Sequence, residues 1–511
     1  MKALKALGLS ALFVLGVGST RASAQESSDD DRTHETDADT HHNTEEPKSA
    51  EQPAPVIEPG ASTATPPAGA VATPPSATVP PAARPKFGDL SVSGYFRGGF
   101  GGSNQGGRMT CFQLANPSGL FSKYRLGNEC EVWSETHFDI VTYVGEDGSV
   151  ASVHFMPTVF IPQTNIGYSP TSTVISPLEF TTSTGATLSF PNLYVDIKGI
   201  PWLYGGTAWV GSRYYKRESV YISDFFYWNP SGVGAGIEDI DLGKGVRVSY
   251  AAFAVDGPPS TNVAGSDPQL PAQYDFGVRN DFQVRGVRPW ESGELQLGFQ
   301  YIADRSNDVP GSPTTHGGWG GTLQFVQQVL GGDNKLAVQY GRGAGTGFGT
   351  LARFYYPDFA LNVPPIQSRF RIVDVLTVQP TPWFGAQLDG VYQLDQNFLG
   401  SAGQYAQWIS AGTRVSWAFT QHAKLLAEAG YDRVVRNNTS PLQPQYLAKF
   451  TIAPTLTTGR GFMTRPELRL FYTWAVWNEA ARTAGIDSGS IYTATSFLSG
   501  SIFGVQAETW Y

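Results

Sequence analysis

Apolar and polar side chains alternate along residues 87–511 of this 511-residue chain, and this period of two constrains its fold more than any other feature. Successive side chains of a β-strand point to opposite faces, so each alternating segment predicts a strand with one apolar face. The body of the chain is therefore predicted to be all-β. Three such apolar faces are formed by Leu295, Leu297, Phe299 and Tyr301, by Leu336, Val338 and Tyr340, and by Leu468, Leu470, Tyr472 and Trp474.

A soluble β-sandwich would show the same alternation, but three features favour a transmembrane barrel. Alternating segments of about ten residues recur along the whole body, which is the length that membrane strands require. Large aromatic side chains gather at the ends of these segments, as they do at membrane interfaces. The chain also ends inside an alternating segment, and an open sheet edge is not stable in lipid. We therefore expect a closed antiparallel barrel of about 16–18 strands.

The last alternating segment has two distinct faces. Its apolar side chains favour the lipid, and its polar side chains, together with Trp510, favour the lumen. The apolar face carries Phe503, Val505, Ala507 and Tyr511, and the other face carries Gln506, Glu508 and Trp510. No run of 18 apolar residues follows the first 25 residues, so a helical membrane span is not predicted.

The N-terminal 86 residues differ in kind from the body. Residues 1–24 have a basic start, an apolar stretch and the small-residue site Ala22-Ser23-Ala24, which predicts a secretory signal peptide. Residues 25–86 are acidic and then rich in Pro and Ala, without apolar periodicity, which predicts a disordered periplasmic arm. His34, His41 and His42 in this arm could bind a metal, but a solvated polar tail is the favoured interpretation.

Charge and histidine content argue against several other functions. The formal net charge is −9, and no cluster of positive charge marks a nucleic-acid interface. Of the seven His, three lie in the arm, and no Ser/His pairing predicts a catalytic nucleophile. We expect that the chain is not an enzyme and that it has no cofactor and no metal site. A secreted soluble carbohydrate-binding β-protein remains an alternative, which would not need detergent for extraction.

Three segments resemble the maltoporin (sugar-porin) family. They are Gly-Tyr-Phe-Arg at 94–97, Lys-Tyr-Arg-Leu-Gly-Asn-Glu-Cys-Glu at 123–131, and the stretch 224–236 with Phe-Phe-Tyr-Trp and Ser-Gly-Val-Gly-Ala-Gly. The terminal pair Trp510-Tyr511 is also similar to that family. The resemblance implies an 18-stranded, trimeric outer-membrane barrel with an inward-folded third extracellular loop. It further implies an aromatic strip that binds sugar rings and a polar track that binds their hydroxyls.

The resemblance assigns roles residue by residue. A pyranose has one apolar face, which stacks on an aromatic ring, and a rim of hydroxyls, which charged side chains bind. Alternation independently places Tyr95 and Arg97 on a lumen face, and Glu131, Trp133 and Glu135 on another. The predicted stacking residues are Tyr95, Trp133, Trp510 and Phe226. Trp133 stands where the family commonly has Tyr, and Phe226 stands where the family has a narrowing Tyr. The predicted polar track is Arg97, Arg125 and Glu135, with Arg217 and Asp224 at the constriction.

The sequence also departs from the family. Ser219 and Asn229 replace two carboxylates beside the constriction, and a second arginine of the track is Pro191. One stacking Trp aligns with Met463, and a stacking Phe aligns with Gly321, where Trp319 on the same strand face could substitute. The loop Trp that enters a neighbouring subunit has no clear counterpart near Ser183. These departures leave the preferred sugar open.

The two cysteines, Cys111 and Cys130, are 19 positions apart and flank a loop. In an exported chain a disulfide is favoured over two free thiols, and the family pairs cysteines at this place. We expect the bond Cys111–Cys130 to rigidify the first extracellular loop.

The predicted function is passive diffusion of oligosaccharides or smaller sugars through a homotrimeric channel in the outer membrane. Such a channel needs several weak binding sites in a row rather than one tight site. The alternative is a general porin, or one for another solute, in which the altered aromatic residues no longer select sugars.

Overall fold

The computed structural model describes residues 85–107, 109–115, 121–162, 179–181, 186–256, 276–305, 317–348, 368–397, 402–437, 443–486 and 491–511. The predicted signal peptide and all but the last two residues of the predicted arm lie outside these ranges, as does Ser183. Within them, no helix has the length and apolar character needed to span a membrane.

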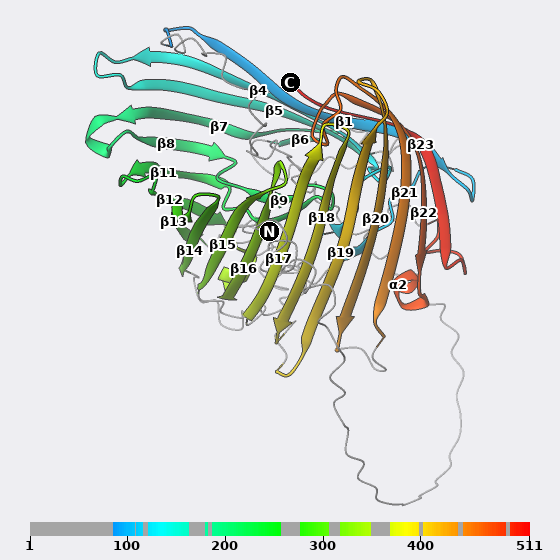
Figure 1. Ribbon diagram of the computed structural model, residues 1–511. Helices are drawn as coiled ribbons and strands as arrows, with labels where there is room; N and C mark the ends of the chain where they lie inside the picture. Colours follow the sequence, from blue (N-terminus) through cyan, green and yellow to red (C-terminus); the bar gives the residue numbers. More distant parts are fainter. Residues whose placement is uncertain are drawn as a thin grey trace, which may run out of the picture.

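Eighteen antiparallel strands pair in a closed ring, so the predicted barrel is confirmed (Figure 1). Each strand pairs with the next along the chain, and β1 closes the ring by pairing with both β4 and β23. The strands are β1 (Leu90–Ser103), β4 (Glu131–Val144), β5 (Val150–Pro162), β7 (Thr187–Ile200), β8 (Gly206–Arg213), β11 (Gly232–Asp241), β12 (Arg247–Asp256), β13 (Phe276–Trp290), β14 (Gly293–Arg305), β15 (Gly318–Val329), β16 (Gly332–Gly343), β17 (Ser368–Thr381), β18 (Phe384–Gln396), β19 (Tyr405–Ala418), β20 (Ala423–Arg436), β21 (Gln445–Thr457), β22 (Glu467–Trp477) and β23 (Ser499–Trp510).

The connections between these strands contain short strands and helices. A three-residue strand pairs with β7, and two small hairpins lie in the first and third long loops. In α2, the Asn478 side chain caps the helix by accepting a hydrogen bond from the backbone of Ala481. These elements are β2 (Leu114–Ala115), β3 (Phe121–Ser122), β6 (Glu179–Thr181), η2 (Pro201–Leu203), β9 (Glu218–Val220), β10 (Phe225–Trp228), η3 (Ala344–Gly347) and α2 (Glu479–Ala484).

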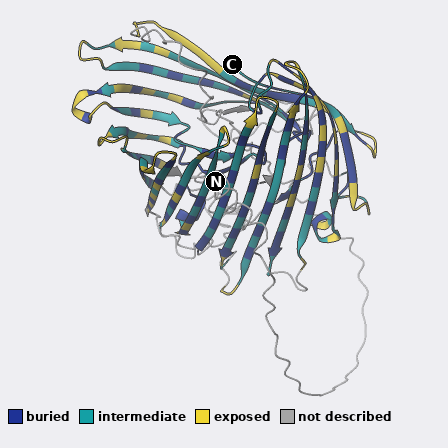
Figure 2. Ribbon diagram, in the orientation of Figure 1, coloured by how far each residue is buried: buried dark blue, intermediate teal, exposed yellow. Residues whose placement is uncertain are grey.

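Burial alternates along the strands as the sequence predicts (Figure 2). On β22, Leu468 and Leu470 are about 60% exposed on the outer face, whereas Glu467 and Arg469 are buried inside. Apolar side chains therefore face the lipid, and the interior is polar, which is the inverse of a soluble protein. At the end of β23, Tyr511 is exposed outside while Gln506 and Glu508 are buried inside.

Long and short connections lie at opposite rims of the barrel. Turns such as 291–292 and 330–331 join strands at the rim where the C-terminus lies, and long loops join them at the other rim. We call three of the long loops L1 (residues 104–130), L3 (residues 214–231) and L6 (residues 344–367). L3 carries the β9–β10 hairpin, whose side chains are mostly buried within the barrel.

Two glycine-rich segments, residues 101–107 and 229–236, have the composition of turns but lie partly in strands. β1 continues to Ser103, and β11 begins at Gly232. The reason is close approach between strands: a Cβ on Gly234 would lie 2.1 Å from the backbone oxygen of Ala252, so a glycine allows this pairing.

Candidate pore-lining site

The predicted site residues of three neighbouring strands meet at one level of the inner wall. Tyr95 on β1 lies opposite Trp510 on β23 and opposite Glu135 on β4. Arg97 lies opposite Glu508 and Trp133 in the same two registers. Because β1 closes the barrel between β4 and β23, the two ends of the chain build this wall together.

Arg97 is the centre of a buried ionic cluster. Its guanidinium pairs with Glu131 at 2.6 Å, with Asp224 of L3 at 3.0 Å and with Glu129 of L1 at 3.2 Å. Lys123 also pairs with Glu131, at 3.0 Å. A buried charge requires such partners, and these partners join β1, β4, L1 and L3 at one point.

Arg125 and Tyr95 extend the cluster towards β23. Arg125 pairs with Glu129 at 2.5 Å and with Glu508 at 3.0 Å. The Tyr95 hydroxyl accepts a hydrogen bond from Arg125 and donates one to Glu508 at 2.9 Å. The residue assigned to sugar stacking thus also holds two charged groups in place through its hydroxyl.

Trp133 and Trp510 lie on either side of Tyr95. The Trp133 indole N–H donates to Glu135 at 2.9 Å, and the Trp133 ring meets the edge of Phe160 at 5.7 Å. The Trp510 ring lies 4.6 Å from the Arg465 guanidinium, an arrangement that favours cation–π attraction.

L3 brings its predicted residues to the same region. Asp224 adopts a left-handed backbone conformation, with φ of 55°, between β9 and β10 and reaches Arg97. The Arg217 guanidinium lies 3.5 Å from the Tyr214 ring and 5.1 Å from the Phe226 ring. Burial lowers the pKa of Arg217 below its ordinary value, although Tyr214, Glu135 and Asp224 act in the opposite direction.

L3 is tied to the opposite wall by hydrogen bonds and ion pairs. The Tyr227 hydroxyl donates to Gln324 of β15 at 2.7 Å, and Gln339 of β16 donates to the Tyr227 carbonyl at 2.9 Å. Glu218 pairs with Lys335 of β16 at 2.9 Å and with Arg285 of β13 at 3.0 Å. The third long loop therefore folds inward, as the resemblance implied.

A family model described as LamB porin matches residues 90–511, which is the entire barrel. The chain belongs to the LamB porin family. It is an outer-membrane channel, and its family and fold are those of channel proteins rather than of enzymes.

Several solved structures are similar to this porin. OmpF of Salmonella typhi, in complex with daunomycin, and OpdK of Pseudomonas aeruginosa each show 9% identity and a TM-score of 0.41. Both matches cover 83% of this chain, with 98% of the OmpF chain and 99% of the OpdK chain. Wzi of Escherichia coli, a carbohydrate-binding β-barrel involved in capsule assembly, shows 11% identity and a TM-score of 0.35, covering 82% of this chain and 84% of that one.

The porin contains an ionic hub that the sequence reasoning did not select. Glu508 pairs with Arg465 at 2.9 Å and with Arg469, and it accepts a hydrogen bond from the Tyr221 hydroxyl of L3 at 2.5 Å. The hub continues to Glu467, which pairs with Lys424 at 2.5 Å. Alternation in the sequence places Glu508 on the inner face beside Trp510. That position was the one sequence feature that could have marked Glu508 as a functional residue.

The four predicted stacking rings differ in how much of their surface is exposed. Tyr95 and Trp133 are each 3% exposed and Phe226 is 8% exposed, so other side chains of the porin cover them. Trp510 is only partly buried. In this structure Trp510 is thus the ring of the four that presents most surface to the lumen.

One predicted substitute in the aromatic strip is wrong. Trp319 does share a strand face with Gly321, but that face is the outer one. Trp319 is 40% exposed, lies opposite the exposed Tyr301 and packs against Tyr340 at 5.7 Å. Trp319 therefore belongs to the outer aromatic surface, because the inner face of β15 carries Gly320, Thr322 and Gln324.

The structure also shows where three other residues that differ from the family pattern lie. Met463 lies in the turn at 458–466, which folds inward; beside it, Phe462 is buried and meets the Tyr221 ring edge at 6.4 Å. Pro191 lies on β7, where the register with β5 shifts between Met156 and Thr158. Ser219 pairs with Phe226 in the L3 hairpin.

The predicted disulfide between Cys111 and Cys130 is confirmed, with a Cα–Cα distance of 5.8 Å. Between the two cysteines, Phe112 packs against Trp477 at 5.5 Å and Tyr492 at 5.2 Å. Asn128 accepts from the Phe112 backbone N–H at 2.8 Å and donates to its carbonyl at 2.8 Å. The bond thus closes a loop that is packed against the last loop of the barrel.

Proposed function

We propose that this porin conducts sugars by facilitated diffusion across the outer membrane. The observation that carries this proposal is the convergence of aromatic and charged side chains on one stretch of inner wall. Tyr95, Trp133 and Trp510 lie on adjacent strands beside Arg97, Arg125 and Glu135. Rings and charge-assisted hydrogen-bonding groups in alternation match the two kinds of surface that a sugar presents.

The roles of the site residues are part of this proposal. Trp510 and Arg465 would receive a sugar ring first, since Trp510 retains exposed surface. Tyr95, Trp133 and Phe226 would make contact only after a ligand displaces neighbouring side chains. Arg97, Arg125, Glu135, Arg217 and Asp224 would bind hydroxyls by exchanging contacts within the cluster. No covalent step is involved, and transport follows the concentration gradient.

We further propose that the porin is a homotrimer, that residues 1–24 are a signal peptide, and that residues 25–86 form an arm in the periplasm. The family supports the first of these proposals. The composition of the N-terminal residues supports the other two.

The test is ion conductance in planar bilayers with added sugars. A sugar-selective channel conducts ions, and sugars that bind inside it reduce the current in an order that ranks their affinity. Maltose, sucrose and glucose, with their longer oligomers, are the probes. Current that none of these sugars reduces would contradict sugar selectivity while leaving the porin fold untouched.

A general porin, or one for another solute, is the second candidate. The burial of Tyr95, Trp133 and Phe226 favours it, because covered rings offer little surface for stacking. The same bilayers separate the two candidates: a general porin would show conductance that scales with ion mobility and no saturable block by any sugar.

A further inference from the structure

The first residue of L3 is held by a side-chain amide of the inner wall. Asn192 of β7 is buried, and its side-chain oxygen accepts a hydrogen bond from the Tyr214 backbone N–H at 2.6 Å. Tyr214 directly follows the last residue of β8. The Arg217 guanidinium, at the predicted constriction, lies 3.5 Å from the Tyr214 ring. Asn192 is therefore linked to the constriction through two contacts.

The other end of the same amide faces a histidine. Because the Asn192 oxygen is engaged by Tyr214, its NH2 group points to His137 of β4, with 2.5 Å between the amide nitrogen and Nε2. An NH2 group only donates, so Nε2 of His137 accepts and carries no proton. Nδ1 of His137 then carries the proton of the neutral ring and lies 3.5 Å from Asp139. This arrangement fits uncharged His137.

Protonation of His137 is incompatible with these contacts. The charged ring has an N–H group on both nitrogens, so Nε2 and the Asn192 NH2 group would be two donors that face each other. Rotation of the amide would turn its oxygen to His137, but it would also turn the NH2 group to the Tyr214 N–H. Asn192 can therefore satisfy either charged His137 or the first residue of L3, and not both.

Protons in the lumen can reach His137. It shares the inner face of β4 with Trp133 and Glu135, since alternate side chains of a strand point the same way. The His137 side chain is 24% exposed and that of Asp139 is 35% exposed, so this surface opens to the lumen. Histidine is the side chain whose charge changes between about pH 5 and pH 8.

The second histidine of this wall has no such link to L3. His154 of β5 contacts Asp139 of β4 and lies 3.0 Å from Asp196 of β7, which in turn lies 3.4 Å from Lys198. Its ring stacks on Tyr194 of β7 at 4.2 Å. Among the described residues the contacts of His154 all belong to the wall, so a change in its charge does not act on L3 directly.

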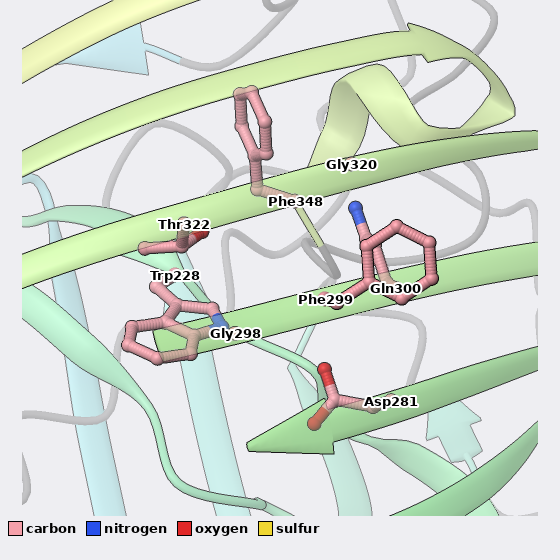
Figure 3. Close-up of a pocket in the computed structure, with 8 residues that line it drawn as sticks. All are labelled: Trp228, Asp281, Gly298, Phe299, Gln300, Gly320, Thr322 and Phe348. Atoms are coloured by element: carbon pink, nitrogen blue, oxygen red, sulfur yellow. The ribbon is translucent and has the colours of Figure 1, made fainter. Parts of the chain in front are cut away.

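The far side of L3 packs closely against the wall. Trp228 contacts β14 at a position where a Cβ on Gly298 would lie 2.3 Å from its ring, and the space left beside it is about 10 Å³ (Figure 3). Such a space holds one water at most. Loss of the Tyr214 contact should therefore loosen the first residues of L3 and leave its far side in place.

We propose that His137 is a proton-sensing residue that couples the pH of the lumen to the seating of L3 through Asn192. Uncharged His137 leaves the Asn192 oxygen bound to Tyr214. Charged His137 competes for that oxygen, so Tyr214 and Arg217 lose their fixed position at the constriction. This device goes beyond the proposed sugar transport, because it acts on any solute or ion that passes L3.

The test is the current noise of open single channels in planar bilayers at about pH 8 and about pH 5, the range in which histidine changes charge. Noise power of the wild-type porin should be at least about twofold higher at the lower pH, since a segment that loses a hydrogen bond opens more often. His137→Gln cannot take up a proton, and its oxygen can accept from Asn192. This variant should keep low noise at both pH values.

Three further variants locate the coupling. Asn192→Ala lacks the amide and should show high noise at both pH values. His422→Gln is the matched control, because His422 lies in the turn between β19 and β20 and contacts Thr457 rather than L3. It should keep the wild-type response to pH, and His154→Gln should keep it as well.

Each outcome decides for or against the proposal. Equal noise of the wild-type porin at both pH values would overturn it, as would a full pH response in His137→Gln. A response that His154→Gln or His422→Gln removes and His137→Gln keeps would assign the sensor to another histidine. Low noise of Asn192→Ala at both pH values would exclude coupling through this amide.

The measurement is independent of the proposed function. Single-channel conductance identifies folded channels, and if Asn192→Ala does not insert, the wild-type porin and His137→Gln decide. No sugar is added, so a porin without sugar selectivity can still show the pH response, and a sugar-selective porin can lack it.

Discussion

At the scale of single residues, Glu508 is a buried carboxylate of the inner wall with several charged and hydroxyl partners. Arg125, Arg465 and Arg469 pair with it, and the Tyr95 and Tyr221 hydroxyls donate to it. These groups come from L1, β1, L3, β22 and the inward turn before β22. One carboxylate therefore joins five segments of the barrel interior.

We predict that Glu508→Gln lowers the stability of the barrel by about 3 kcal/mol, since removal of one member of a buried ionic group leaves the others unpaired. Chemical unfolding in detergent measures this loss. The control is Glu479→Gln, which removes an exposed ion pair with Arg482 on α2 and should change stability by less than about 1 kcal/mol. Equal effects of the two substitutions would contradict the role of the hub.

We predict that Trp510→Ala raises the half-blocking concentration of bound sugars about tenfold, since it removes the most accessible of the predicted stacking rings. Ion conductance should persist, because the backbone of β23 remains paired with β1 and β22. Trp417→Ala is the matched control, since Trp417 is 60% exposed on the outer face. Sugar block that stays at the wild-type value in Trp510→Ala would remove this ring from the sugar path.

At the scale of elements, L1 is held by its disulfide and L3 by charges on the wall. The disulfide spans 19 positions, and Glu218 joins the L3 hairpin to β13 and β16. Both loops lie beside the Arg97 cluster, so each tether positions part of the site.

Removal of the disulfide should lower the stability of the porin by up to about 3 kcal/mol, because the closed loop restricts the unfolded chain. Thermal unfolding of wild-type porin with and without a thiol reductant measures this change. A variant with both Cys111→Ser and Cys130→Ser should unfold at the temperature of the reduced wild type and should not respond to reductant. A large response of that variant would show that the reductant acts elsewhere.

Glu218→Gln should loosen L3 and increase the open-channel noise of single channels, since Arg285 and Lys335 would lose a buried carboxylate. The barrel itself should remain closed, because Glu218 lies on the loop and outside the paired ring of 18 strands. Asp147→Asn serves as a control, since Asp147 is exposed in the turn between β4 and β5, outside L3, and accepts hydrogen bonds from Ser149. Noise equal to that of the wild type would mean that other contacts suffice to hold L3.

At the scale of the whole molecule, closure by β1 between β4 and β23 brings residues from the two ends of the chain into contact. Tyr95 and Glu508 are 413 positions apart, yet they are joined by a hydrogen bond at 2.9 Å. The site is therefore complete only when the barrel is closed.

For the proposed trimer we predict that single insertions into a bilayer close in three equal steps, one for each barrel. Chemical crosslinking in detergent should give a largest product of three chains. Closure in a single step, together with one-chain products alone, would indicate a monomeric porin. The sugar-binding predictions would stand in either case, because the residues they use lie in one chain.

The sequence by itself determined the strands, their two faces and the identity of the residues inside. Period-two alternation is a local property, so Tyr95, Arg97, Trp133, Glu135 and Trp510 could be placed on the inner wall without any knowledge of the fold. The same reasoning placed Tyr511 outside. Composition alone does not define every strand: the glycine-rich residues 232–236 have the composition of a turn, yet they belong to β11 because strand pairing depends on distant segments.

The tertiary structure alone decided the partners of these side chains. Strand register, ring closure and the path of L3 depend on contacts between distant segments, which no local pattern encodes. They decided that Glu508 joins several segments and that Tyr95 and Trp133 are covered. The residues of the inner wall can thus be predicted from the sequence, but the ion pairs among them depend on which strands and loops lie next to one another.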